Sequence, residues 1–175
     1  MAGIEIVGLG PGDPAYLTRA AWKRITSAKR VYLRTSEHPC AAHIQAEVET
    51  VSFDDLYRTC ESYEAVYQTI VERILSEAAA GDVVYAVPGD PMVGESTGSG
   101  ILQAAAERDI PCRIIPGISF MEVCLQEAKI DALDGLVLVD ALEVNQRSYP
   151  PFSPDTPVLI SQVYSRMVAS DLKLV

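Results

Sequence analysis

The segment from Val83 to Gly94 constrains the fold of this chain more than any other stretch of its sequence. Its first five residues, Val-Val-Tyr-Ala-Val, are apolar and mostly β-branched or aromatic, a pattern typical of a strand buried on both faces. Pro88 ends the strand because proline has no N–H to donate to a neighbouring strand. Gly89 and Gly94 bracket a tight turn, and residues 95–108 are predicted to form a helix. A buried strand, a glycine turn and a helix in succession indicate the ligand-binding edge of an α/β sheet.

A second unit of the same kind lies at the start of the chain. Residues 3–7 are predicted to form a strand, and the glycine-rich turn 8–12 follows it. Asp13 is a good N-cap and Pro14 suits the first position of a helix, so we expect a helix to begin directly after the turn. We therefore predict one small-molecule site between this turn and the turn at 88–94.

Strand and helix patterns alternate along the rest of the chain. This alternation predicts an α/β fold with a mainly parallel sheet and helices on both faces. The further strands are expected at 30–34, 48–53, 112–115, 136–139 and 158–163, and the further helices at 41–46, 62–80, 119–128 and 166–175.

The size and composition of the chain limit its class. Its 175 residues, 49% of them hydrophobic, suffice for one compact core or for one domain plus part of a second. No apolar run approaches the roughly 20 residues of a membrane helix, and no signal peptide is visible. The four cysteines fall at irregular spacings, which favours reduced, mostly buried thiols in a cytoplasmic protein over a disulfide framework.

The charge distribution argues against nucleic acid as a partner, since the net charge is −10. Residues 1–34 nevertheless hold six basic side chains against two acidic ones. We interpret this cluster as the solvated face of a helix, with the seat of an anionic ligand as the alternative.

The first glycine turn differs from the dinucleotide fingerprint G-x-G-x-x-G, because Asp13 occupies the third glycine position. Pro11 also lacks the N–H that a pyrophosphate would need, which disfavours an NAD-type enzyme. The turns suit a neutral or cationic ligand with an adenosine part, for which Asp90 would accept hydrogen bonds from ribose hydroxyls and Val93 would pack on adenine. The alternative is that the glycines only make tight turns.

Four segments together resemble the tetrapyrrole (corrin/porphyrin) methylase superfamily, whose members use S-adenosylmethionine. They are residues 7–14 with Leu17-Thr18, residues 88–91, residues 116–119 and the late strand at 159–163. Within the superfamily, the chain is most similar to the methylase-like N-terminal domain of MazG-type nucleoside triphosphate pyrophosphohydrolases. The segments that carry this closer resemblance are Leu33-Arg34-Thr35 with His38-Pro39, residues 52–57, and residues 162–166 with Ala169-Ser170-Asp171.

The resemblance implies a two-domain fold, S-adenosyl-L-methionine as cofactor in the cleft between the domains, and a homodimer. The domains would be an N-terminal α/β methylase domain at 1–117 and a partial second α/β domain at 118–175. The second domain is expected to be incomplete because family domains continue well past this point. The cofactor-binding residues implied by the resemblance are Pro11, Gly89, Asp90, Val93, Ser119, Phe120 and Gln162.

Methyl transfer needs few catalytic side chains because the cofactor carries the chemistry. The weak candidates for contact with a substrate are Asp13, Thr35 and His38, although a loop histidine that caps a turn is the simpler interpretation of His38. A metal site formed by His38, Cys40 and His43 is disfavoured because it lacks a fourth ligand.

Two functions of different class remain open at this point. The first is a methyltransferase acting on an unidentified small molecule, expected from the resemblance to be tetrapyrrole-like, although a chain at −10 attracts carboxylated tetrapyrroles poorly. The second is a non-catalytic ligand-sensing or assembly domain that serves a MazG-type pyrophosphohydrolase.

Overall fold

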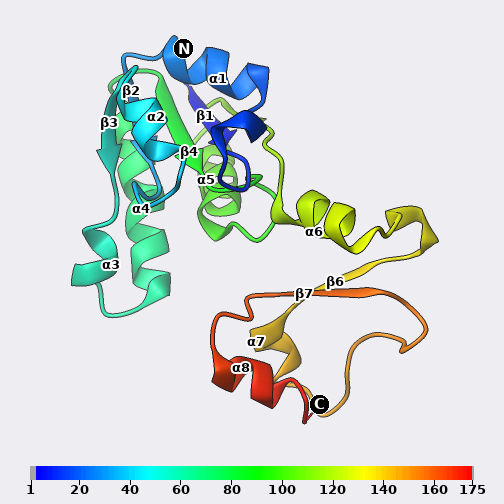
Figure 1. Ribbon diagram of the computed structural model, residues 1–175. Coiled ribbons are helices and arrows are strands. Elements are labelled where there is room, and N and C mark those ends of the chain that lie inside the picture. Colours follow the sequence, from blue (N-terminus) through cyan, green and yellow to red (C-terminus); the bar gives the residue numbers. More distant parts are fainter. Residues whose placement is uncertain (1–2, 175) are drawn as a thin grey trace. The chain divides into compact units, whose positions relative to one another are not determined.

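The apolar runs near the N-terminus form one parallel sheet of five strands in the order β3-β2-β4-β1-β5. The computed structural model describes residues 3–174, and it divides into two units between Phe120 and Met121 (Figure 1). All pairings in the sheet of the first unit are parallel. The strands are β1 (Ile4–Gly8), β2 (Arg30–Leu33), β3 (Glu49–Ser52), β4 (Val83–Val87) and β5 (Cys112–Ile115).

Helices connect the strands and lie on both faces of the sheet, so the predicted α/β fold with a mainly parallel sheet is confirmed. The helices of the first unit are the short 3₁₀ helix η1 (Pro14–Tyr16), α1 (Arg19–Thr26), α2 (Ala41–Gln45), α3 (Leu56–Thr59), α4 (Tyr63–Ala78) and α5 (Ser96–Glu107).

Strand β4 lies at the centre of the sheet and all five of its residues are buried. Val83, Tyr85 and Val87 face a cluster that includes side chains of α4 and α5, whereas Val84 and Ala86 face a cluster built with α1 and α2. This alternation follows from the two-residue period of a strand, and it explains why both faces of this segment are apolar.

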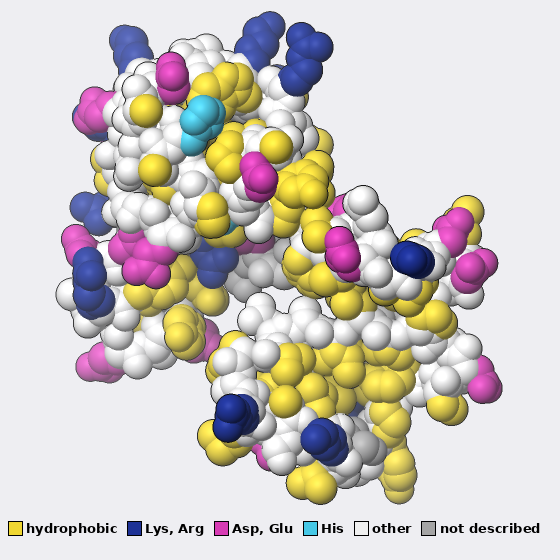
Figure 2. Space-filling view, in the orientation of Figure 1, with side chains coloured by type: hydrophobic (Ala, Val, Ile, Leu, Met, Phe, Trp, Pro, Cys, Tyr) yellow, Lys and Arg dark blue, Asp and Glu magenta, His cyan; other side chains and the backbone are white. Residues whose placement is uncertain are grey.

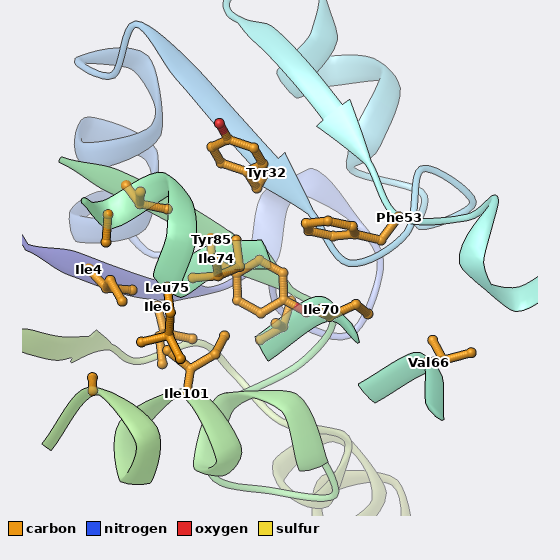
Figure 3. Close-up of a cluster of buried hydrophobic side chains, with 14 residues drawn as sticks. Ile4, Ile6, Tyr32, Phe53, Val66, Ile70, Ile74, Leu75, Tyr85 and Ile101 are labelled. Carbon is orange, nitrogen blue, oxygen red and sulfur yellow. The ribbon is translucent and has the colours of Figure 1, made fainter. Parts of the chain in front are cut away.

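The larger cluster is held by the apolar face of α4. Val66, Ile70 and Ile74 repeat every four residues and pack toward the sheet, where the rings of Phe53 and Tyr85 meet edge to face. Figure 3 shows Ile70 and Ile74 beside Tyr85, between the strands and the helices. The helix begins as the sequence predicts, since the Ser62 hydroxyl accepts a hydrogen bond from the Ala65 N–H.

The segment after the first glycine turn differs from the prediction of one continuous helix. Asp13 caps only η1, and Leu17 is then extended, so the chain leaves the helical path before α1. Thr18 caps α1 instead, because its hydroxyl accepts a hydrogen bond from the Ala21 N–H. The prediction was wrong here because it used the first good capping residue and missed the second, five residues later.

Two smaller expectations also need correction. The short helix α3 was not predicted, because four residues show no helical period. The prediction of mostly buried thiols was wrong, since Cys40 is buried, Cys60 and Cys112 are half-buried and Cys124 is exposed.

The basic cluster near the N-terminus consists mainly of solvated side chains. Figure 2 shows Lys and Arg side chains projecting into solvent at the α1 end of the first unit. Arg19, Lys23, Lys29 and Arg30 are exposed, and Arg24 is paired with Glu5. These observations favour the solvated-helix interpretation over an anion seat.

The second unit contains a parallel pair of strands with short helices. Its elements are α6 (Phe120–Ala128), which begins at the division between the units, the 3₁₀ helix η2 (Ala132–Asp134), β6 (Val137–Asp140), α7 (Ala141–Val144), β7 (Val158–Ser161) and α8 (Arg166–Asp171). The sequence predicted both strands within one or two residues but missed α7. Among the described residues, no helix has the length and apolarity that crossing a bilayer requires.

We predict that Ile70→Ala lowers the free energy of unfolding by about 2–5 kcal/mol, because the substitution leaves a cavity in the larger cluster, where Ile70 is fully buried. Urea denaturation followed by circular dichroism measures the change. Gln68→Ala, at an exposed position of the same helix, is the control and should change the value by less than about 0.5 kcal/mol. Equal effects of the two substitutions would contradict this packing.

We also predict acid sensitivity at the loops that follow β2 and β3. Burial alone would raise the pKa of Asp54, but hydrogen bonds from Ser36 and Ser52 lower it from 3.8 to about 2. Because the folded pKa lies below the unfolded one, this contribution is present above pH 4 and is lost as the pH falls toward 2. Asp54→Asn should therefore lower the unfolding free energy at pH 7 and flatten its decline between about pH 4 and pH 2. An unchanged pH profile in this variant would contradict the assignment.

Candidate functional site

The turns that follow β1 and β4 are hydrogen-bonded to each other at the carboxyl edge of the sheet. Gly10 N–H donates to the Gly89 carbonyl at 3.1 Å, and Gly89 N–H donates to the Gly10 carbonyl at 2.8 Å. This pairing follows from the topology, because β1 and β4 are parallel neighbours and their carboxyl ends meet at the same edge. The two turns that the sequence singled out are therefore adjacent.

A third turn, which follows β5, joins them. Gly117 N–H donates to Asp90 Oδ2 at 3.1 Å. A Cβ atom on Gly117 would lie 2.2 Å from the Gly89 carbonyl oxygen, and one on Gly8 would lie 2.5 Å from the Gly117 nitrogen. The backbones of the three turns approach so closely that only glycine fits at positions 8 and 117.

The edge formed by these turns presents bare main chain. Gly89 has a φ of +67°, and no atom lies within 4 Å of the position that a Cβ atom would take there. Pro11, in the first turn, is exposed. Because the turns bond directly to each other, a ligand would contact the edge that they form together and would not enter a gap between them. This arrangement suits a ligand that needs close approach to the backbone.

Asp90 is held by the main chain around it. Its Oδ1 accepts a hydrogen bond from Met92 N–H at 2.8 Å, and its Oδ2 accepts the bond from Gly117. An ionised carboxylate has about four acceptor positions, so two remain for ligand hydroxyls. Val93 is half-buried beside it, and its N–H donates to the Asp90 carbonyl.

The remaining predicted cofactor residues lie in two places. Ser119 is buried directly after the third turn, and the Phe120 ring lies 3.5 Å from the position that a Cβ atom on Gly94 would take. Gln162 lies in the second unit, where it is exposed and follows β7 with a φ of +62°. The structure thus brings Gly89, Asp90 and the first turn together by hydrogen bonds within one unit.

Each of the weak catalytic candidates already makes a hydrogen bond to the backbone. Asp13 Oδ1 accepts from Ala15 N–H at 2.8 Å, and Thr35 Oγ1 accepts from Glu37 N–H at 3.1 Å. His38 Nε2 lies 3.1 Å from the Gly10 carbonyl oxygen. Burial lowers the pKa of His38 and the Gly10 carbonyl opposes this only in part, so the ring is neutral at pH 7.

The set His38, Cys40 and His43 is already engaged with protein groups. Cys40 Sγ donates to the Gly12 carbonyl at 2.9 Å, and burial raises the pKa of this thiol. The His43 ring stacks on Trp22 with centroids 4.7 Å apart. These contacts give each side chain a role that needs no metal.

The sequence analysis missed a buried ion pair between Arg34 and Glu95. The two side chains are 19% and 2% exposed, and Arg34 Nη1 lies 3.1 Å from Glu95 Oε1. Arg34 also donates to the Tyr57 hydroxyl at 3.0 Å, and Glu95 accepts from the Thr97 hydroxyl at 2.8 Å. The pair ties the end of β2 to the end of the turn after β4.

This ion pair belongs to a wider buried polar network. The Thr97 hydroxyl lies 2.7 Å from that of Tyr85, in the central strand. Burial and then the charge of Glu95 raise the pKa of Tyr85 well above its usual value, so this phenol stays protonated. Two signals could have drawn attention to the two residues, namely a cation directly after an apolar strand and an acid at a helix N-terminus, but neither shows that they pair.

A cavity of about 660 Å³ lies at the opposite, amino-terminal edge of the sheet. Its lining includes Arg30, Tyr32, Glu49 and Glu77, which pair with one another as Arg30–Glu49 and Tyr32–Glu77. Ligands of open α/β sheets bind outside the carboxyl ends of the strands, and these four side chains already bond one another, Arg30 with Glu49 as an ion pair and Tyr32 with Glu77 through its hydroxyl. We therefore place the candidate site at the three turns.

Comparisons with known proteins agree with this architecture. The sequence pattern of the family Tetrapyrrole (Corrin/Porphyrin) Methylases matches residues 3–169. The chain is 35% identical to the uncharacterized protein YabN of Bacillus subtilis over 99% of its own length, and 30% identical to siroheme synthase 1 of Aeromonas hydrophila over 69%. It spans only 35% and 26% of these two relatives.

One solved structure has a related fold along most of the chain. It is uroporphyrin-III C-methyltransferase from Thermus thermophilus complexed with S-adenosylhomocysteine. The alignment has a TM-score of 0.63 and 22% identity, and it covers 99% of this chain and 72% of the other. With the pattern matched over residues 3–169 and the three turns joined at one edge, the chain belongs to the tetrapyrrole methylase family.

Proposed function

We propose that this chain binds S-adenosyl-L-methionine along the edge formed by its three turns and transfers the methyl group to a small molecule. The observation that carries the proposal is the reciprocal pairing of Gly10 with Gly89, which leaves bare backbone beside the Asp90 carboxylate. Membership of a methylase family and a structural neighbour complexed with S-adenosylhomocysteine support it.

The residues at this edge fit the cofactor chemically. The two free acceptor positions of Asp90 match the two hydroxyls of a ribose, and the half-buried Val93 offers an apolar surface for adenine. A sulfonium is cationic, so it needs no phosphate-binding N–H groups, which agrees with Pro11 in the first turn. In this proposal Pro11, Gly89, Asp90, Val93, Ser119 and Phe120 hold the cofactor. A role for Gln162, which belongs to the second unit, is proposed from the resemblance of the sequence alone.

Methyl transfer from a sulfonium is an in-line displacement. The protein must align the acceptor with the methyl–sulfur bond and exclude water, and the cofactor supplies the leaving group. The backbone hydrogen bonds of Asp13, Thr35 and His38 are compatible with this chemistry, because alignment requires no strong acid or base.

Further parts of the proposal rest on the resemblance of the sequence. We propose a tetrapyrrole-like acceptor, a homodimer and a relation to the methylase-like domain of MazG-type pyrophosphohydrolases. A cytoplasmic location is proposed on a separate ground, the irregular spacing of the four cysteines. We also propose that residues 118–175 belong to a second α/β domain.

The second candidate is a non-catalytic ligand-sensing or assembly domain. The hydrogen bonds of Asp13, Thr35 and His38 favour it, because each of these side chains is already bonded to the backbone and so has a structural role. It shares the proposed cofactor site and differs only in the absence of turnover.

We predict that the chain binds S-adenosylhomocysteine in isothermal titration calorimetry and that Asp90→Leu weakens binding at least about tenfold, through loss of charged hydrogen bonds to the ligand. Asp82→Leu is the matched control, because Asp82 also accepts a backbone N–H but lies before β4, at the other edge of the sheet. Binding by Asp90→Leu equal to that of the parent chain would show that the ligand lies elsewhere.

A second prediction separates the two candidate functions. Incubated with S-adenosylmethionine labelled at its methyl group and with uroporphyrin III, the compound in the name of the structural neighbour, the parent chain should transfer label, and Asp90→Leu should transfer at least about tenfold less at subsaturating cofactor. Mass spectrometry of the product identifies the methylated atom. Tight binding of S-adenosylhomocysteine without transfer, here or to a pool of small metabolites, would favour the sensing domain.

A further inference from the structure

The loop that follows β2 is hydrogen-bonded to the first glycine turn at three carbonyls. His38 Nε2 lies 3.1 Å from the Gly10 carbonyl oxygen, and Cys40 Sγ lies 2.9 Å from that of Gly12 and 3.6 Å from that of Leu9. We call residues 38–40 the strap. The strap binds the side of the turn that carries carbonyls, and it leaves Pro11 exposed.

The hydrogen bonds around His38 fix its tautomer. Cys40 N–H donates to Nδ1 at 3.3 Å, so Nδ1 carries no proton. The Nε2 atom therefore carries the proton and donates to the Gly10 carbonyl. Burial keeps the ring neutral by lowering the pKa of His38. A neutral ring with one donor and one acceptor satisfies both contacts, which a protonated ring cannot do.

The Gly10 carbonyl is the point where the strap and the paired turns meet. It accepts from Gly89 N–H at 2.8 Å and from His38, so both of its lone pairs are used. Gly10 has a φ of +77°, and a glycine in this region is free to rotate its peptide unit unless hydrogen bonds hold it. Loss of the His38 bond would leave only Gly89 to orient this carbonyl.

We infer that His38 is a positioning residue that orients the Gly10 carbonyl and so holds the paired turns in the shape that binds the cofactor. This inference rests on the proposed function, since it assigns His38 to the same site. His38 is thereby distinct from a catalytic residue: it acts through the turn and does not contact the reacting atoms.

The inference predicts a dependence on pH that belongs to this ring. Protonation would keep the Nε2–H bond to the Gly10 carbonyl but would place a second N–H at Nδ1, opposite the Cys40 N–H, and so would break the hydrogen bond by which Cys40 holds the ring in place. Because burial favours the neutral ring, the contribution is complete above the ordinary histidine pKa of about 6.5 and is lost as the pH falls through the lower folded value. The strap faces the carbonyls of Gly10, Leu9 and Gly12, and the charge of Asp13 adds to burial in raising the pKa of the Cys40 thiol.

The test compares His38→Ala and His38→Gln with His43→Ala. Glutamine offers an amide N–H that can reach the Gly10 carbonyl and does not titrate, whereas His43, the other histidine of the chain, stacks on Trp22 and does not bond the turn. Two readouts are needed: amide hydrogen exchange of residues 8–12 and 88–91 without ligand, and the Kd for S-adenosylhomocysteine from pH 5 to pH 8.

We expect His38→Ala to speed exchange in both turns and to weaken binding at pH 7.5 by roughly three- to tenfold, the loss of about one hydrogen bond. His38→Gln should restore most of the affinity and remove its decline below about pH 6.5. His43→Ala should behave as the parent chain, and Asp13→Asn should keep the pH dependence.

Each other outcome has a defined meaning. Parent-like exchange and affinity in His38→Ala would overturn the inference while leaving the proposed function intact, as would faster exchange with unchanged affinity. If the parent chain binds no S-adenosylhomocysteine, the proposed function and the assignment of His38 to it both fail, and the exchange data then report only on the turn.

Discussion

The reciprocal hydrogen bonds between Gly10 and Gly89 are the contact on which the architecture of the carboxyl edge depends. They join the turns that follow two neighbouring parallel strands, and Gly117 closes on the same point from a third strand. The approach is so close that side chains at positions 8 and 117 would occupy space that backbone atoms already fill. Three glycine turns therefore act as one structural unit, and a change in any of them would displace the others.

The surroundings of this unit restrict how it can move. On the β2 side, the buried pair of Arg34 and Glu95 ties the strand end to the last residues of the second turn. Removing one member of such a buried pair is expected to cost about 3–5 kcal/mol, because the other charge is left uncompensated. At the first turn, the imidazole and the thiol of the strap donate hydrogen bonds to the main-chain carbonyls of Gly10 and Gly12. In the ion pair and in the strap, polar side chains hold the backbone of the turns in place. The outer edge of the turns therefore presents bare main chain.

Because the polar side chains near the candidate site support the turns and the backbone forms the binding edge, few side chains there look catalytic. Asp13, Thr35 and His38 attracted attention as polar residues beside glycine turns, yet Asp13 and Thr35 each bond a backbone N–H two residues away, and His38 bonds the Gly10 carbonyl of the first turn. A sulfonium cofactor carries its own leaving group, so a protein that binds it contributes mainly position and exclusion of water. Rigid turns supported from behind are the kind of structure that this task requires.

The sequence by itself determined the class of fold and the identity of the two turns. The run Val83–Val87 predicts a strand buried on both faces because its side chains are apolar at every position, and a parallel sheet is the structure that buries such a strand. The four-residue repeat of Val66, Ile70 and Ile74 likewise predicts α4, since periodicity is a local property. Local rules failed where two capping residues compete, as with Asp13 and Thr18, and where helices are too short to show a period, as in α3.

Only the tertiary structure decided which residues meet. The order β3-β2-β4-β1-β5 places β4 beside β1, although 74 residues separate Gly8 from Val83, and this neighbourhood is what joins Gly10 to Gly89. The partner of Arg34 and the carbonyl bound by His38 were equally invisible in the sequence. Propensity and period act over a few residues, whereas these contacts depend on the path of the whole chain, so they become known only when the sheet is assembled.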